Sequence, residues 1–522
     1  MFLVRATFVH TPELDVLEVL HNYLAAIDDD GHISYLGPFN SNESTAFLSG
    51  ISKGVELVNV PEGSFILPTF SDLHLHAPQF LYQGTGLDLP LMQWLDNYAL
   101  KAELRLDNDP ILARRVYTRL ASRLKENGTG TVLLFGTIKE ETNLILAQCM
   151  QAAGLRGFVG KLSMDVDITS PGSASKTYIE DSASEALKSA RSFVRRCQHM
   201  QEHLPAAQRL VEPVLTPRFV PTCSEELLNG LGRMSEELGV KVQSHMAEAK
   251  DQVEWVRALR GMEDVEVFDK NGLLTPRTIQ AHCTFLSPTE LSLVSERGTA
   301  IAHCPLSNAY FSAQPFPLRE ALGRGAKVGL GTDIAGGYSA DIMNAMRQAV
   351  AVSRMREGER VMSLPTAQKD QAKEEPEAQK RSIDWKEALF LATRGGALCL
   401  GLPGVFRVGA PFDAQQIRLY DPANGRGFGA VDYFDLETDL ADTSIMDEEN
   451  RKGTSAPSVA LAQQEHLQKG RQKGEQHQPQ EHQTYEHQPL ADHELIEKWW
   501  SVGDNRNRSA VWVQGKLIWV SP

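Results

Sequence analysis

Cysteine is scarce in this sequence, and no two cysteines form a CxxC pair. There are six in 522 residues, at positions 149, 197, 223, 283, 304 and 399. Disulfide frameworks are typical of short secreted chains, and CxxC pairs are typical of structural zinc sites. Six scattered cysteines instead indicate reduced thiols, which favours a cytoplasmic protein.

Long apolar runs and an excess of positive charge are also missing. No stretch approaches the roughly 20 apolar residues that span a bilayer, and residues 1–10 carry a charge too early for a signal peptide. The chain has a formal net charge of −15. An acidic chain is poorly suited to nucleic acid or to an anionic membrane. We therefore expect neither as a partner.

The two ends of the chain share one pattern. Residues 1–66 and 401–522 show short strands separated by turns, including a C-terminal hairpin that turns at 514–515. They predict a small β-sandwich-like domain built from both ends. Within it, residues 450–492 are rich in Gln, Glu, His and Lys, which predicts a disordered insertion. Its regularly spaced histidines could also bind stray metal.

Between the two ends, short β-rich runs alternate with amphipathic helical stretches. Strands that alternate with helices favour a parallel sheet. Eight such units over roughly 270 residues match an α/β fold of the (β/α)8 TIM-barrel type. We assign residues 67–400 to this barrel and 364–383 to a polar, exposed insertion. The predicted strands are the run that ends at His76 and residues 131–135, 157–161, 211–216, 240–245, 278–282, 300–303 and 327–333. The predicted helices are 111–127, 142–153, 184–203, 224–238, 250–260, 288–297, 317–323, 340–355 and 385–399.

The first barrel strand ends in a pair of histidines, His74 and His76. Residues two apart in a strand point to the same face. Two imidazoles side by side are half of a tetrahedral zinc site. An isolated pair would equally fit a strand end with two solvated histidines, so the other strands have to decide.

Four more strands close on a polar residue. They are His245, His282, His303 and Asp333. In a TIM barrel the chemistry lies at the C-terminal ends of the strands, so we expect His245, His282 and Asp333 in one cavity with the histidine pair. Imidazole and carboxylate suit zinc, and also iron(II) or manganese.

A catalytic zinc takes about three protein ligands and keeps one position open for water. The candidate ligands are His74, His76, His245, His282 and Asp333. Five candidates exceed the four positions, so one of them orients the water instead. His282 is our choice for that role, although the sequence leaves open whether it also binds the metal.

Glu248 lies three residues beyond His245. A carboxylate just past a metal-bound histidine can reach both the water and the substrate, and can act as general acid and base. The plain alternative is a helix N-terminal carboxylate stabilised by the helix dipole. Asp333 could similarly bind metal and take a proton from the attacking water.

Several stretches together resemble the amidohydrolase superfamily, in its aminohydrolase branch. They are Pro68-x-Phe-x-Asp72-x-His74-x-His76, the strand-end His245 and His282, His303-Cys304-Pro305-x-Ser307-Asn308 and Gly331-Thr332-Asp333. Further stretches resemble the members of that branch that deaminate guanine, among them His76-Ala77-Pro78-Gln79, Thr216-Pro217-Arg218-Phe219 and Ser244-His245-Met246-Ala247-Glu248. The resemblance implies a (β/α)8 barrel with a small β-domain.

The resemblance also implies an activity. It implies hydrolysis of guanine to xanthine and ammonia by a zinc-activated water, with one Zn²⁺ per chain and a cytoplasmic homodimer. Glu248 would shuttle the proton, with Asp333 and His282 also catalytic. Gln79, Arg218 and Phe219 would hold the purine beside His245, Glu248 and Asp333. Independently, an amide and a guanidinium can pair with the oxygen and nitrogens of guanine, and an aromatic ring can cover its face.

Some features depart from the pattern. Leu306 stands where an Asn is common in such enzymes, and the insertions at 364–383 and 450–492 have no counterpart. One alternative is a sister aminohydrolase acting on another purine, a pterin or a triazine. Another is a non-catalytic scaffold, although such relatives normally lose ligands, and here all the candidate ligands and Glu248 are present.

Overall fold

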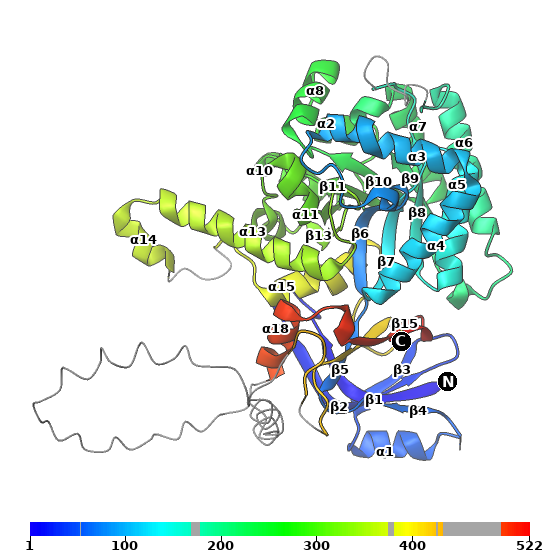
Figure 1. Ribbon diagram of the computed structural model, residues 1–522, viewed down its shortest axis with the longest axis vertical. Coiled ribbons are helices and arrows are strands. Elements are labelled where there is room, and N and C mark those ends of the chain that lie inside the picture. The colour runs from blue at the N-terminus through cyan, green and yellow to red at the C-terminus, as the bar shows by residue number, and fades with distance from the viewer. Residues whose placement is uncertain (53, 169–177, 374–379, 424–425, 432–491) are drawn as a thin grey trace, which may run out of the picture.

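The computed structural model describes residues 1–522 except 53, 169–177, 374–379, 424–425 and 432–491. The described chain forms two bodies, a large one with strands enclosed by helices and a smaller β-rich one (Figure 1). Both chain termini lie in the smaller body. Among the described residues, no helix is both long and apolar enough to cross a membrane.

The larger body contains an eight-stranded sheet in which every neighbouring pair is parallel. Its strands follow the chain in order, as βα units with right-handed crossovers require. They are β6 (Phe70–His76), β7 (Thr129–Phe135), β8 (Arg156–Ser163), β9 (Val211–Pro217), β10 (Lys241–Met246), β11 (Thr278–His282), β12 (Ala300–His303) and β13 (Lys327–Leu330). The predicted TIM-barrel class is confirmed, with all eight predicted strands present.

The first and last strands of the barrel meet through the segment that follows β13. The backbone N–H of Asp333 donates to the carbonyl of His74 at 2.8 Å, and that of His76 donates to the carbonyl of Ile334 at 2.9 Å. The Asp72 carboxylate accepts from both the N–H and the hydroxyl of Thr332. This seam closes the ring, and it also brings Asp333 beside the histidine pair.

The smaller body contains a second, mixed sheet of eight strands, in the order β16-β15-β14-β5-β1-β2-β3 with β4 paired to β1. Its strands come from both ends of the chain, as the sequence predicts, and the C-terminal hairpin turns at the predicted place. They are β1 (Phe2–His10), β2 (Glu18–Ile27), β3 (Ile33–Pro38), β4 (Leu57–Asn59), β5 (Ser64–Pro68), β14 (Ala414–Arg418), β15 (Arg508–Val513) and β16 (Lys516–Val520).

Most helices begin and end within a few residues of the predicted limits. Several start at a serine or aspartate whose side chain accepts from the first turn, such as Asp109, Ser182 and Ser224, which satisfies an otherwise unpaired N–H. The α-helices of eight residues or more are α1 (Asn42–Ser49), α3 (Leu100–Asn108), α4 (Pro110–Glu126), α5 (Glu140–Ala153), α6 (Ala183–His199), α7 (Glu225–Leu238), α8 (Lys250–Arg260), α10 (Pro288–Glu296), α13 (Ile342–Ser363), α14 (Thr366–Lys373) and α18 (Asp492–Val502). The shorter ones are α2 (Leu91–Trp94), α9 (Asp264–Lys270), α11 (Pro305–Ser307), α12 (Leu318–Gly323), α15 (Trp385–Phe390) and α16 (Gly396–Cys399).

Two predicted helices differ from the structure. The helix predicted over 340–355 continues to Ser363. The helix predicted over 385–399 is divided into α15, a π-helical turn over Leu391–Gly395 and α16. Propensity does not distinguish an α-turn from a π-turn, so the sequence could not have located this break.

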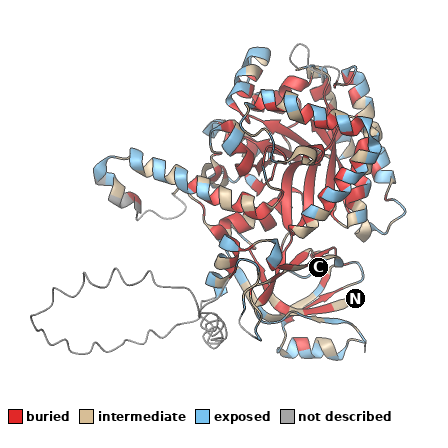
Figure 2. Cartoon of the chain, viewed as in Figure 1, coloured by how far each residue is buried: buried red, intermediate tan, exposed pale blue. Residues whose placement is uncertain are grey.

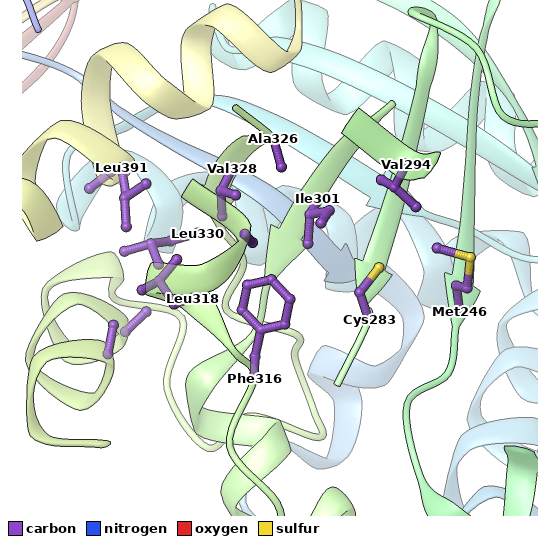
Figure 3. Packing of buried hydrophobic residues seen from close by; sticks show 14 of the residues in the cluster. Met246, Cys283, Val294, Ile301, Phe316, Leu318, Ala326, Val328, Leu330 and Leu391 are labelled. Carbon is purple, nitrogen blue, oxygen red and sulfur yellow. The ribbon is translucent and has the colours of Figure 1, made fainter. Parts of the chain in front are cut away.

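The apolar interior is continuous across the two bodies. The barrel strands are buried along their length (Figure 2). The largest apolar cluster combines barrel residues such as Ile301 and Val328 with Phe65 and Trp499 of the smaller body. Figure 3 shows Ile301, Val328 and Leu330 between the barrel strands and the surrounding elements. Because this core is shared, the division into 1–66 plus 401–522 and 67–400 remains a prediction.

Of the two predicted insertions, one lies mostly within the described residues and the other lies almost wholly outside them. Residues 364–383 are not uniformly exposed, since Ala372 and Ile383 are buried and the N–H of Ile383 donates to the Ser353 hydroxyl at 3.0 Å. These two apolar residues are too isolated in a polar segment for the sequence to reveal their burial. The predicted insertion at 450–492 lies outside the described residues, apart from Asp492 at the start of α18.

Candidate active site

A narrow cavity lies at the C-terminal ends of the barrel strands. A larger groove on the outer face of α4 has none of the predicted site residues, so the cavity is the candidate site. Its walls combine predicted catalytic and substrate-binding residues with aromatic side chains. They are His76, Gln79, Leu91, Trp94, Leu95, Arg218, Phe219, His245, Glu248, Ser307, Phe311, Asp333 and Gly336.

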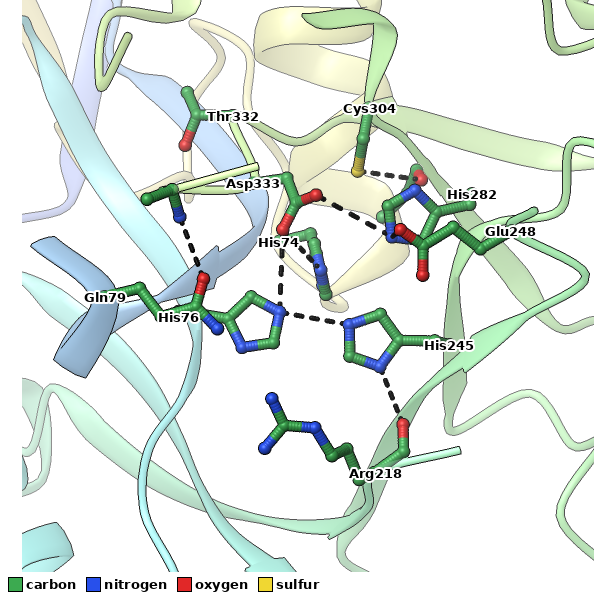
Figure 4. Close-up of polar contacts among 12 residues, drawn as sticks. His74, His76, Gln79, Arg218, His245, Glu248, His282, Cys304, Thr332 and Asp333 are labelled. Carbon is green, nitrogen blue, oxygen red and sulfur yellow. Dashed lines mark hydrogen bonds and ion pairs between the residues drawn. The ribbon is translucent and has the colours of Figure 1, made fainter. Parts of the chain in front are cut away.

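Three histidines and a carboxylate converge at the floor of this cavity (Figure 4). The Nε2 atoms of His76 and His245 are 3.0 Å apart. The Oδ1 atom of Asp333 is 3.1 Å from Nε2 of His74 and 3.5 Å from Nε2 of His76. These residues come from β6, β10 and the seam after β13. The structure therefore brings together residues that are more than 250 positions apart in the chain.

His282 lies on the other side of the Asp333 carboxylate. Its Nε2 atom is 3.8 Å from Oδ2 of Asp333 and 3.7 Å from Oε1 of Glu248. Its Nδ1 atom is 2.9 Å from Oδ1 of Asn308. An amide oxygen only accepts, so Nδ1 carries the proton and Nε2 keeps its lone pair toward the two carboxylates. His282 thus faces the carboxylates of Asp333 and Glu248 in the tautomer that can bind a metal or accept a proton.

The histidines are held in the form that metal ions require. Burial, as the largest cause, lowers the pKa of His74, His76 and His245 well below the ordinary value, so these rings are neutral. The Nδ1–H of His245 donates to the carbonyl of Arg218 at 2.7 Å, which leaves its Nε2 lone pair facing the cavity. Such a hydrogen bond behind a ligand is typical of metal-binding histidines.

Two histidine nitrogens without hydrogen-bond partners also indicate that the cluster can bind a metal. The Nε2 atoms of His74 and His282 are buried and have no hydrogen-bond partner. Buried polar groups are normally paired. Donor atoms of His74, His76 and His245 lie within 4.8 Å of one another, as do those of Glu248, His282 and Asp333. Imidazole nitrogens with one carboxylate are a donor set that zinc accepts.

The two carboxylates that border the cluster share an unfavourable environment. Burial, as the largest cause, raises the pKa of Glu248 well above its ordinary value, and the nearby charge of Asp333 adds to the effect. Burial also raises the pKa of Asp333, while His282 opposes that rise. Paired carboxylates at close range resist simultaneous ionisation. A cation between them would remove that conflict, and a shared proton would do the same.

The backbone at this site adopts an unusual conformation. His282 and Asp333 both have positive φ, 68° and 50°. This left-handed region is uncommon for residues other than glycine, and its strain concentrates at functional sites. At both positions the chain leaves a barrel strand, so the turn aims each side chain toward the centre of the ring.

Gln79, Arg218 and Phe219 also line the cavity, and we call them the substrate wall. We call His74, His76, His245 and Asp333 the acceptor cluster. The Gln79 amide oxygen accepts from the N–H of Ala335 at 3.0 Å. The Arg218 guanidinium is buried and forms a two-pronged ion pair with Glu103 of α3, at 2.5 and 2.9 Å. The Phe219 ring is also buried and packs edge-on against Trp255. All predicted substrate-binding residues therefore border one space.

Sequence reasoning missed two residues that support this site. Glu103 is one acidic residue in an amphipathic helix and carries no local signal of its role. Asp72 is part of the first motif, but only the fold shows that it ties β6 to Thr332, the neighbour of Asp333. Burial raises the pKa of Asp72 to about 7.

The fifth strand-end histidine, His303, is also buried, but it lies outside the cavity, beside Phe316. Leu306, the departure from the family pattern, is buried in the turn α11 and does not line the cavity. The substitution therefore leaves the walls of the cavity unchanged.

Comparisons with known proteins agree with this geometry. The model of the amidohydrolase family matches residues 65–518. The guanine deaminase of Mus musculus is 36% identical over 418 residues, which cover 79% of this chain and 85% of that protein.

Solved structures give the same fold. The guanine deaminase from C. acetobutylicum, solved with guanine in its active site, superposes with a TM-score of 0.75 at 24% identity, covering 99% of this chain and 100% of that one. An adenosine deaminase from Xanthomonas campestris with bound zinc has a TM-score of 0.68 at 20% identity, covering 99% and 92%. The family match and the sequence identity together show the group: the chain belongs to the amidohydrolase family, in the branch that contains the guanine deaminases.

Proposed function

We propose that this chain hydrolyses guanine to xanthine and ammonia. The observation that carries the proposal is the meeting of two kinds of group in one cavity. The acceptors of His76, His245 and Asp333 border the same cavity as the donors of Gln79 and Arg218, and His74 lies beside Asp333. A ring bound by the donors would place one of its carbons beside the acceptors and Glu248.

We further propose that the acceptor cluster holds one zinc ion per chain, on His74, His76, His245 and Asp333, with His282 on the ion or beside it. The unpaired buried nitrogens and the neutral state of the rings support this. When bound, such an ion lowers the pKa of a water toward neutrality and polarises it for attack.

The remaining steps belong to the protein's own groups. Water adds to C2 of the ring, and Glu248 takes a proton from that water and delivers it to N3. Asp333 and His282 hold the water in line through their free oxygen and nitrogen. The new hydroxyl on C2 then gives its proton to Glu248, and Glu248 passes that proton to the amino nitrogen. The bond from C2 to this nitrogen breaks, the C2 carbonyl forms, and the amino group leaves as ammonia. Guanine and water thus balance xanthine and ammonia.

The substrate wall orients the ring and keeps bulk water out. Arg218 and Gln79 supply donors for its oxygen and nitrogen acceptors. Phe219, Trp94 and Phe311 surround the space with aromatic surface, which suits the faces and edges of a flat ring. Orientation of this kind supplies much of the rate that an enzyme gains over solution.

The test is a spectrophotometric assay of guanine conversion, with and without a chelator, on the wild type and Glu248→Gln. We expect the variant to keep its metal and fold but lose at least about a thousandfold in kcat, as expected for a lost proton shuttle. Good turnover of a pterin or triazine with negligible turnover of guanine would overturn the proposal. Loss of both metal and fold in the variant would identify Glu248 as a structural carboxylate.

Two further features are part of the proposal. All six cysteines are free and buried, which supports a reducing, cytoplasmic location. The homodimer is proposed from the family resemblance alone. Light scattering on the purified chain tests the dimer, and a monomeric mass at micromolar concentration would contradict it.

A further inference from the structure

Behind the substrate wall lies a buried carboxylate that touches both polar residues of that wall. Glu103 has no exposed surface and is not among the residues that line the cavity. Its oxygens accept from Nη1 and Nη2 of Arg218 at 2.5 and 2.9 Å. The Oε1 atom of Glu103, which accepts from Nη2 of Arg218, also lies 3.4 Å from Nε2 of Gln79. One residue of α3 therefore contacts both Arg218 and Gln79 from the side away from the substrate.

The orientation of the Gln79 amide is fixed from two directions. The N–H of Ala335 can only donate, so the atom that it meets at 3.0 Å must be the amide oxygen. The carboxylate of Glu103 can only accept, so the atom that faces it must be the amide nitrogen. Figure 4 shows the amide oxygen of Gln79 in the first of these contacts. Of the two N–H donors of Gln79, the second is therefore the one left for a ligand.

Arg218 is constrained in the same manner. Two of its five N–H groups bind Glu103, and the residue also lines the cavity. A guanidinium has no acceptor in any orientation. Its charge is also matched by Glu103, so the wall attracts acceptors on a neutral ring more than it attracts an anion.

We propose that Glu103 is a positioning residue that sets substrate choice, by fixing the orientation in which Gln79 and Arg218 present their N–H donors to the cavity. The proposal rests on the proposed function. It specifies the substrate class as neutral rings with a carbonyl oxygen and a ring nitrogen on the bound edge, as in 6-oxopurines. A 6-aminopurine presents N–H groups to those donors and leaves buried polar groups unpaired, which sites of this type reject strongly.

The test compares guanine with 2,6-diaminopurine, which keeps the 2-amino leaving group but replaces the carbonyl with an amino group. The wild type is expected to favour guanine in kcat/KM by at least about 100-fold. In Glu103→Gln, one carboxylate oxygen becomes an N–H donor that faces other donors. The KM for guanine should rise about tenfold or more, kcat should change by less than about threefold, and the preference should fall at least about tenfold.

A matched control separates this role from a loss of stability. Lys161 and Glu180 form another buried ion pair in the barrel, at 2.7 Å, and neither lines the cavity. Glu180→Gln makes the same substitution in the same kind of pair. Its melting temperature should fall as much as that of Glu103→Gln, with the guanine preference unchanged.

The outcomes are distinct. An unchanged preference in Glu103→Gln, or an equal fall in Glu180→Gln, would overturn the positioning role and leave the proposed function intact. A wild type that turns over neither purine would overturn the proposed function itself. If Glu103→Gln does not fold, Glu103→Asp carries the test, because it keeps the charge but is too short for both contacts. A wild-type preference in that variant would overturn the role.

Discussion

The acceptor cluster and the substrate wall differ in whether their polar groups already have partners. On the metal side, His74, His76 and Asp333 face one another at close range, and buried nitrogens remain unpaired. On the substrate side, Arg218 and Gln79 are each held by fixed partners before any ligand arrives. This difference indicates which ligand each group of residues is suited to bind. Under the proposed function, a cation would satisfy the acceptors of the first wall, whereas the second is already arranged for a ring.

The largest effect should follow removal of the cation from the acceptor wall. Treatment with a chelator, or the substitution His76→Ala, should lower kcat/KM by about ten-thousandfold or more, because the means of activating water is lost. Metal analysis and the guanine assay measure this together. His303→Gln is the control, since His303 also ends a barrel strand but lies outside the cavity. Equal loss of metal in the control would show that the cluster is not the site.

A substitution in the substrate wall should change a different kinetic constant, KM rather than kcat. Arg218→Lys keeps the charge but loses the planar fork that binds Glu103 and the ring together. We expect kcat/KM for guanine to fall about 100-fold, mainly through KM, with the metal content unchanged. Steady-state kinetics on metal-loaded protein provide the measurement. A loss confined to kcat would place Arg218 on the side of the chemistry.

A smaller effect is expected at His282, which lies beside Asp333 and Glu248. Asn308→Ala removes the acceptor of the His282 Nδ1–H, so the ring can adopt the other tautomer. We expect kcat to fall about tenfold or more, with KM little changed. Asn308→Asp restores an acceptor and should recover part of the loss. Equal activities of the Ala and Asp variants would contradict an orienting role for Asn308.

The smallest effect concerns stability. Asp264 lies behind the acceptor wall, as Glu103 lies behind the donor wall, but its partners are neutral: the N–H of Ala247 at 2.9 Å and the amide of Gln252 at 3.2 Å. Burial, the largest cause, raises the pKa of Asp264 from 3.8 to about 7. The folded chain therefore binds more protons than the unfolded chain between these values, and stability falls as pH rises through that window.

Asp264→Asn removes the titrating group and should remove part of that fall. The melting temperature of the variant should exceed that of the wild type by about 3 °C at pH 8 and by much less at pH 5. Thermal unfolding at the two pH values is the measurement. The same difference at both pH values would mean that packing, rather than protonation, causes the effect.

The barrel and the histidine cluster could be predicted from the sequence because their signals are local. An apolar run that ends in His76 or His245 is readable within a few residues, and so is the alternation of strands and helices. The fold then brings these ends together, as the parallel topology requires. What remains a proposal is the role of each residue, since position in a cavity does not identify a proton shuttle.

The parts that could not be predicted depend on contacts between distant segments. Glu103 pairs with Arg218, 115 positions away, only because α3 folds over the cavity. Asp72 meets Thr332, 260 positions away, only once the ring has closed. The burial of Ile383 within a polar segment depends likewise on α13. No periodicity in the chain reports such pairings.

The seam between β6 and the segment after β13 has a consequence for assembly. Every other strand boundary in the barrel joins neighbours along the chain, whereas this one joins its beginning to its end. An ion bound by His74, His76 and Asp333 together would cross-link the first strand of the barrel to the segment that follows its last strand. Binding of the ion and closure of the barrel would then be thermodynamically linked, so that each favours the other. A nascent chain would acquire its ion only after its last strand emerges, and release of that ion would loosen the barrel first at this joint.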